Sequence, residues 1–136
     1  IVIADKIAWE PALQENVQLE GRSHVSGAEF GAQYKLSDKW LVDFDATYTD
    51  SKKPDGAREV RVPRVQANVS FNAEITNALT LGASLRHVND VVDIADALLK
   101  DYTLFNLRGS YQLSDTLQAY ARLENATDKD YEVISG

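Results

Sequence analysis

The feature that most constrains the fold of this chain is a strict alternation of apolar and polar side chains, clearest after residue 102. One set of alternate positions carries Thr103, Phe105, Leu107, Gly109, Tyr111 and Leu113. The positions between them carry Asn106, Arg108, Ser110 and Gln112. Because successive side chains of a β-strand point to opposite faces, this pattern predicts a strand that is apolar on one face and polar on the other.

A tight turn and a returning strand follow directly. Ser114-Asp115-Thr116 is turn-forming, since Ser and Asp side chains bond their own backbone. The segment after the turn alternates again, with Leu117 and Leu123 among the apolar positions and Tyr120 and Arg122 among the polar ones. The stretch 102–123 is therefore predicted to be an amphipathic β-hairpin.

The same pattern recurs along the chain and predicts about seven strands. A strand is expected over Ile1 to Trp9, ended by Pro11, and alternation resumes from Gly27. Short connections are expected at 37–39, about 75–78 and 114–116. Long connections are expected at 10–15, 50–59, 88–100 and from 126 onward. The connection 88–100 is expected to contain a helical turn at 94–99. Short turns alternating with long loops are typical of an all-β, antiparallel up-and-down meander.

Composition narrows the classes of protein and of site. The formal net charge of −7 argues against a nucleic-acid partner, because phosphate binding needs a basic surface. There is no cysteine, which excludes disulfides, thiolate metal sites and cysteine nucleophiles. No apolar run approaches the ~18 residues of a transmembrane helix, but barrel strands, which are only alternately apolar, need no such run.

Alternation alone leaves two orientations of the apolar faces open. A soluble β-sandwich or binding module turns them inward, whereas an outer-membrane barrel turns them toward lipid. Aromatic residues near the expected strand ends favour an orientation toward lipid. Tyr34, Trp40 and Tyr111 lie beside short turns, and Tyr48 lies at the far end of its strand. The eight steps of ~3.3 Å from Trp40 to Tyr48, tilted by ~40°, span ~20 Å, close to the ~25 Å apolar band of such barrels.

Several motifs resemble a known family. Tyr-Thr-Leu-x-Asn-Leu-Arg from Tyr102, Arg-Val-Pro-Arg at 61–64, and Glu-Asn-x-x-Asp-Lys-Asp-Tyr-Glu from Glu124 resemble the C-terminal barrel region of TonB-dependent outer-membrane receptors, nearest to cobalamin and siderophore receptors. Ala126 and Thr127 depart from the Leu-Phe usual there.

The resemblance implies a transmembrane barrel of about 22 strands around an N-terminal plug. Residues 1–136 would then be a C-terminal portion of that barrel, a fragment without the plug and the last strand. It further implies location in the bacterial outer membrane and uptake of a scarce large nutrient, such as a metal chelate or cobalamin. The implied partners are the nutrient, the lipid bilayer with its lipopolysaccharide, and TonB acting through the missing plug.

Two sets of carboxylates are candidate sites. Asp90, Asp93 and Asp96 are spaced by three in a loop and could ligate calcium, although the glycine and ligand order of an EF-hand are missing and a solvated acidic loop is the simpler interpretation. Asp43 and Asp45 share one face of a strand ~7 Å apart and would be the acid and base of a barrel enzyme. Lumen charges paired with Arg or Lys of neighbouring strands explain them better, so no catalytic residue and no cofactor are expected.

The phase of each strand predicts which side chains share a face. Phe44, Val69, Leu85 and Leu107 are expected to point outward, and Gln66 inward. The polar residues expected to line a lumen are Glu29, Asp43, Asp45, Arg86, Arg108, Arg122 and Glu124.

Overall fold

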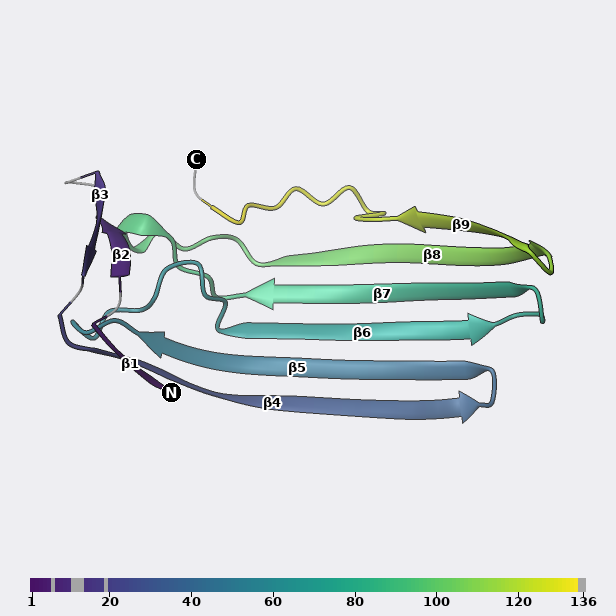
Figure 1. Cartoon of the computed structure of the whole chain (residues 1–136), viewed down its shortest axis with the longest axis horizontal. Helices are drawn as coiled ribbons and strands as arrows, with labels where there is room; N and C mark the ends of the chain where they lie inside the picture. Colours follow the sequence, from purple (N-terminus) through teal and green to yellow (C-terminus); the bar gives the residue numbers. More distant parts are fainter. Residues whose placement is uncertain (6, 11–13, 19, 135–136) are drawn as a thin grey trace.

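The computed structural model describes residues 1–5, 7–10, 14–18 and 20–134, and shows one large antiparallel sheet with a small hairpin beside it (Figure 1). Seven strands form the large sheet in the order β1-β4-β5-β6-β7-β8-β9, and β2 and β3 pair separately. The strands are β1 Val2–Ala4, β2 Ile7–Glu10, β3 Glu15–Gln18, β4 Arg22–Ser37, β5 Trp40–Lys52, β6 Val65–Glu74, β7 Leu79–Asn89, β8 Tyr102–Ser114 and β9 Leu117–Leu123. A 3-10 turn, η1, spans Ile94–Asp96.

Tight turns join the strand pairs β4-β5, β6-β7 and β8-β9, as the alternation predicted. Ser37 pairs with Trp40 and Ser114 with Leu117, so the β4-β5 and β8-β9 hairpins each close across two residues. The Ser37 hydroxyl accepts the Lys39 backbone N–H at 3.2 Å, and Thr76 accepts the backbone N–H of Leu79 at 3.0 Å. Side chains that bond the backbone of the turn therefore reverse the chain at the predicted places.

The N-terminal prediction was wrong in one respect. Ile1 to Trp9 does not form one strand, because the chain turns at Asp5, which has a φ of 51°. The backbone N–H of Asp5 donates to the carbonyl of Gly21 at 3.0 Å, and this bond directs β1 onto β4 and β2 onto β3. The predicted break at Pro11 lies outside the described residues.

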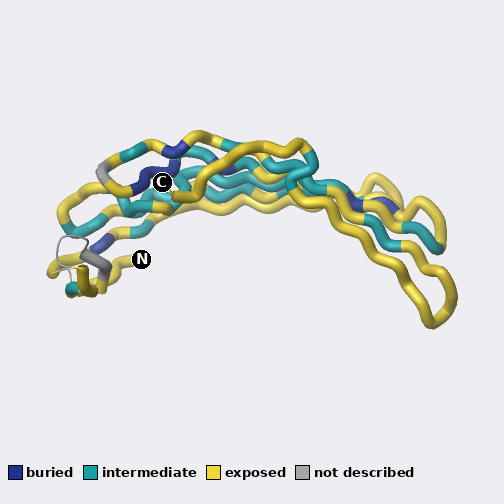
Figure 2. The backbone as a smooth tube through the Cα atoms, turned by 90° about the horizontal axis from the view of Figure 1, so that it is seen from above, coloured by how far each residue is buried: buried dark blue, intermediate teal, exposed yellow. Residues whose placement is uncertain are grey.

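The large sheet is a single layer that arches along its strands (Figure 2). The buried hydrophobic residues among those described are few: Ala73, Val88, Val91, Val92 and Leu99. All but Ala73 belong to the end of β7 and the loop after it. A soluble sandwich would bury one whole face of each sheet in a core, whereas in the described part of the chain no second sheet covers either face of this layer.

The two ends of the sheet differ. The three tight turns lie at one end, and the loops 53–64 and 90–101 and the β2-β3 hairpin lie at the other (Figure 1). The predicted rhythm of short and long connections thus corresponds to two different rims. Within the described residues, no helix has the length and apolar character needed to cross a membrane.

Candidate functional site

The predicted polar residues do share one face of the large sheet. Directly paired residues of neighbouring strands lie on the same face, and Asp43 pairs with Gln33 and Ser70, while Arg108 pairs with Gly82 and Arg122. The same rule places Glu29, Asp45 and Arg86 on this face. Glu124 follows β9 and forms an ion pair with Arg122. We call this surface the polar face and the opposite surface the apolar face.

Strand β6 bridges the charged parts of the polar face with neutral side chains. Toward β5, Asn68 donates to the Asp45 carboxylate at 3.1 Å and Ser70 to that of Asp43 at 3.4 Å. Toward β7 and β8, the Gln66 side-chain oxygen accepts from Arg86 at 3.1 Å, and that of Asn72 accepts from Arg108. The prediction that Asp43 and Asp45 pair with Arg or Lys is therefore wrong, because the neighbouring strand offers amides and a hydroxyl instead.

Charge is segregated across the middle of this face. Of the residues predicted to line a lumen, Glu29, Asp43 and Asp45 lie on β4 and β5, and Arg86, Arg108 and Arg122 lie on β7, β8 and β9; Lys35 of β4 also lies on this face, near the tight turn. The amides of β6 separate the two groups. Sequence analysis missed this arrangement, although the alternation Gln66-x-Asn68-x-Ser70-x-Asn72 was visible in the sequence.

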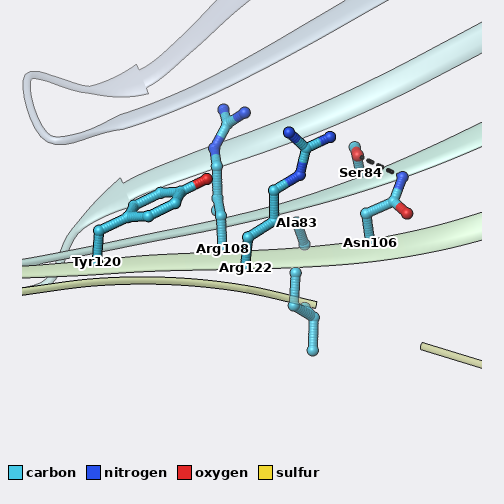
Figure 3. Close-up of a pocket in the computed structure, with 8 residues that line it drawn as sticks. Ala83, Ser84, Asn106, Arg108, Tyr120 and Arg122 are labelled. Atoms are coloured by element: carbon cyan, nitrogen blue, oxygen red, sulfur yellow. Dashed lines mark hydrogen bonds between the residues drawn. The ribbon is translucent and has the colours of Figure 1, made fainter. Parts of the chain in front are cut away.

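Gly82 makes room for the Arg108–Asn72 hydrogen bond, which joins two strands that are not neighbours. A Cβ built on Gly82 would lie 2.5 Å from Arg108 Nε and 2.8 Å from its Cγ. Arg108 therefore extends from β8 across β7 at Gly82 to reach Asn72 on β6. Beside it lies a shallow hollow lined by Ser84, Asn106, Arg108, Tyr120 and Arg122, with Gly82, Ala83 and Leu107 completing the lining (Figure 3).

The apolar face carries the residues predicted to point outward. Phe44 pairs with Val69, Val69 with Leu85, and Leu85 with Phe105, so these side chains form a row across the strands. Aromatic rings stand near both ends of the strands: Tyr34 is 68% exposed, Tyr111 48% and Tyr48 46%. Trp40 contacts Phe71 edge-on with ring centroids 5.3 Å apart.

His87 lies on the apolar face of β7, and its ring is hydrogen-bonded. Its Nδ1 lies 2.9 Å from the hydroxyl of Thr103, the residue paired with it on β8. This position is near the long-loop end of β7. A hydrogen bond within the sheet lowers the cost of a polar group on an apolar surface.

The two long loops are joined by arginine–aspartate pairs, which we call the rim clamp. In loop 53–64, Arg58 contacts Asp90 at 2.7 Å, Arg64 contacts Asp90 at 3.1 Å, and Arg61 contacts Asp93 at 2.7 Å. Asp93 is 0% exposed. The sequence does contain a signal for this clamp. Arg58, Arg61 and Arg64 are spaced by three residues, as are Asp90, Asp93 and Asp96.

The rim clamp bears on the calcium hypothesis. Asp90 binds the guanidinium groups of Arg58 and Arg64, Asp93 binds that of Arg61, and Asp96 lies at the end of the turn η1. In residues 1–5, 7–10, 14–18 and 20–134, no group of three metal-ligating side chains is gathered. Calcium binding by Asp90, Asp93 and Asp96 stays a prediction that this geometry does not favour.

The segment after β9 continues in the same direction alongside β8 (Figure 1). The backbone N–H of Ala126 donates to the Phe105 carbonyl at 2.7 Å, and that of Asn125 donates to the Asn106 side chain at 2.9 Å. The Asn125 side chain accepts from the Lys129 N–H at 2.9 Å and donates to the Lys129 carbonyl at 3.0 Å, which closes a loop. The Asn-x-x-Asp-Lys motif thus has a structural role, and Ala126 and Thr127 are accommodated in it.

Comparison with known proteins decides the family. The family described as "TonB dependent receptor-like, beta-barrel" matches residues 2–126. The chain belongs to the TonB-dependent receptor family. Its fold is therefore a seven-stranded part of a receptor barrel, and the family places it in the bacterial outer membrane.

Individual TonB-dependent receptors are distant in sequence. A probable siderophore receptor, PiuA of Acinetobacter baumannii, is 23% identical over 93% of this chain, and the vitamin B12 transporter BtuB of Vibrio vulnificus is 25% identical over 92%. The chain spans 19% of the length of each. Among solved structures, the copper transporter OprC superposes with a TM-score of 0.79 at 22% identity, covering 96% of this chain and 22% of that protein.

Proposed function

We propose that the chain forms part of the wall of an outer-membrane receptor that takes up a scarce large nutrient, of the class of metal chelates, siderophores or cobalamin. In this proposal the apolar face contacts the bilayer and lipopolysaccharide, and the polar face lines the lumen. TonB supplies the energy through a plug elsewhere in the receptor. Membership of the family and the names of the relatives, which include siderophore, vitamin B12 and copper receptors, support the nutrient class.

The observation that carries the proposal is the single layer with two unlike faces. An exposed apolar sheet face is costly in water, at ~25 cal/mol per Å² of apolar surface, but stable against lipid. The polar face is cross-linked by side-chain bonds from β4 to β8, including Gln33 to Asp43 at 2.7 Å and Asn106 to Ser84 at 3.4 Å. A soluble binding module would need a second layer over the apolar face.

The alternative of a barrel enzyme based on Asp43 and Asp45 is less well supported. Both carboxylates accept hydrogen bonds from neutral groups of neighbouring strands. The named relatives are transport receptors. We therefore infer that these aspartates hold adjacent strands together and that the chain has no catalytic role.

Site-directed spin labelling tests which face meets lipid. The chain has no cysteine, so single cysteines can be placed at Val69 and Leu85 on the apolar face, with Asn68 and Ser84 as adjacent controls on the polar face. In liposomes, we expect molecular oxygen to relax labels at 69 and 85, and a water-soluble nickel complex to relax those at 68 and 84. Relaxation of the labels at 69 and 85 by the nickel complex, or by neither reagent, would show that the apolar face does not meet lipid.

Uptake tests the transport function separately. The full gene product that carries this segment is expressed in bacteria lacking their own receptors, with TonB present or deleted. Radiolabelled cobalamin, ferric siderophores and copper are the probes. We expect accumulation of one probe class that is lost without TonB, and unchanged uptake in Asp43→Asn. Accumulation that is equal with and without TonB would refute the mechanism.

A further inference from the structure

The hollow between β7, β8 and β9 presents two arginines to the same point of the polar face. Arg108 and Arg122 are directly paired across β8 and β9, so their Cβ atoms lie about 5 Å apart. Figure 3 shows both guanidinium groups projecting to the same side of the sheet, with the ring of Tyr120 beside them. Like charges directly opposite each other destabilise a sheet unless something of opposite charge lies between them.

The charges near this pair leave it cationic. Arg122 pairs with the exposed Glu124, but Arg108 bonds the neutral Asn72, and within the described part of the chain no carboxylate forms an ion pair with Arg108. Asp43 and Asp45, on the same face, are held on β5 by their own hydrogen bonds. Gly82 is needed for the extended path of Arg108, because a Cβ there would collide with it.

From this geometry we infer an oxyanion-binding site formed by Arg108 and Arg122, with the Tyr120 hydroxyl as a third donor. Planar guanidinium groups match the oxygens of a carboxylate or a phosphate, and two of them neutralise it better than one. The hollow is lined by further hydrogen-bonding groups, Ser84 and Asn106, which bond each other and close its far side. The inference goes beyond the proposed function and does not depend on which nutrient is transported.

The oxyanion that the two arginines bind has two possible sources: a free anion, or the carboxylate of a polypeptide segment that lies against the polar face. Titrations of the chain in detergent micelles distinguish them. Inorganic phosphate is one probe, and a short neutral peptide with a single Asp, compared with its Asn counterpart, is the other. The readouts are the NMR shifts of the arginine Nε–H groups, which report contact at the guanidinium itself, and of the backbone amides around the hollow, which remain measurable in variants that lack these arginines.

We expect saturable shifts at Arg108 and Arg122, and a loss of affinity of about tenfold in Arg108→Gln or Arg122→Gln, since each removes a charge-assisted pair. Arg122→Lys keeps the charge but not the planar fork and should lose less. Arg86→Gln is the matched control, because Arg86 lies on the same face but bonds Gln66 instead, and its affinity should be unchanged. Circular dichroism verifies that each variant retains its strands.

Binding of phosphate alone would support a free-anion site, and preference for the Asp peptide over its Asn counterpart would support a polypeptide carboxylate. Two results would overturn the inference. One is the absence of saturable shifts with either probe in the folded wild type. The other is equal affinity in wild type and in the folded double variant Arg108→Gln/Arg122→Gln.

Discussion

At the scale of single residues, the polar face depends on positions where a side chain is missing. Its glycines differ in what surrounds them. A Cβ at Gly82 would meet the flexible Arg108 side chain, and one at Gly27 would lie 2.3 Å from the backbone oxygen of Tyr48. At Gly31 a Cβ would meet nothing within 4 Å. A methyl group added at these three glycines would therefore meet a movable side chain at Gly82, backbone at Gly27 and open space at Gly31.

This difference predicts a graded alanine series. Gly31→Ala should be nearly neutral in the free energy of unfolding, and Gly82→Ala should cost about 1 kcal/mol, because Arg108 must give up its bond to Asn72. Gly27→Ala should cost about 2 kcal/mol or more, since only a shift of the β4–β5 backbone relieves the contact. Urea unfolding in micelles measures the series. Equal costs at Gly31 and Gly27 would contradict it.

At the scale of elements, the long loops hold each other through the rim clamp. Arg61 has a φ of 62°, and its backbone N–H donates to the Val92 carbonyl at 2.7 Å while its side chain reaches Asp93. The loop 90–101 packs Val91 and Leu99 on Val88, with Tyr102 against this cluster. Val88 and Tyr102 lie on the polar face, so the loop folds over the polar side of the rim.

Removing one arginine of the clamp should release loop 90–101. Arg61→Ala removes a guanidinium that contacts the buried Asp93, which should cost about 2 kcal/mol. Hydrogen exchange of the Leu99 amide, which donates to the Val91 carbonyl at 2.9 Å, reports the loosening. Arg58→Ala is the control, because Asp90 keeps Arg64 and is partly exposed, so about 0.5 kcal/mol is expected. Faster exchange in Arg58→Ala than in Arg61→Ala would disprove this assignment of roles.

At the scale of the whole molecule, the sheet has two open edges and an exposed apolar face. At one edge, β1 pairs only with residues 22–24 of β4, and at the other edge β9 pairs with β8 only from Leu107 to Ser114. Unpaired strand edges are templates for association, and a barrel removes them by closing on itself.

The chain by itself is therefore expected to need a membrane mimic. In plain buffer it should aggregate or pair edge to edge, because neither the apolar face nor the edges are covered. In detergent it should stay dispersed with a strand-rich spectrum. Size-exclusion chromatography and scanning calorimetry measure both. A sharp monomer peak in plain buffer with a cooperative unfolding transition would instead establish a soluble module.

The sequence by itself determined the strands from 27 to 123, the three tight turns and the membership of each face. Alternation and turn chemistry act between neighbouring residues, so they can be recognised without knowing the fold. This is why Phe44, Val69 and Arg108 were assigned to the correct relative faces. The family motifs added the barrel, because a single layer cannot be distinguished from a sandwich by its period alone.

Only the tertiary structure decided which side chains bond across strands. The partners of Asp43 are set by register, which no local pattern fixes: shifting β6 by two residues keeps every face and changes every pair. The splitting of residues 1–9 into β1 and β2 likewise depends on the bond from Asp5 to Gly21, 16 residues apart. The rim clamp and the Arg108–Arg122 pair arise in the same way, because strand pairing brings together charges that are far apart in the chain.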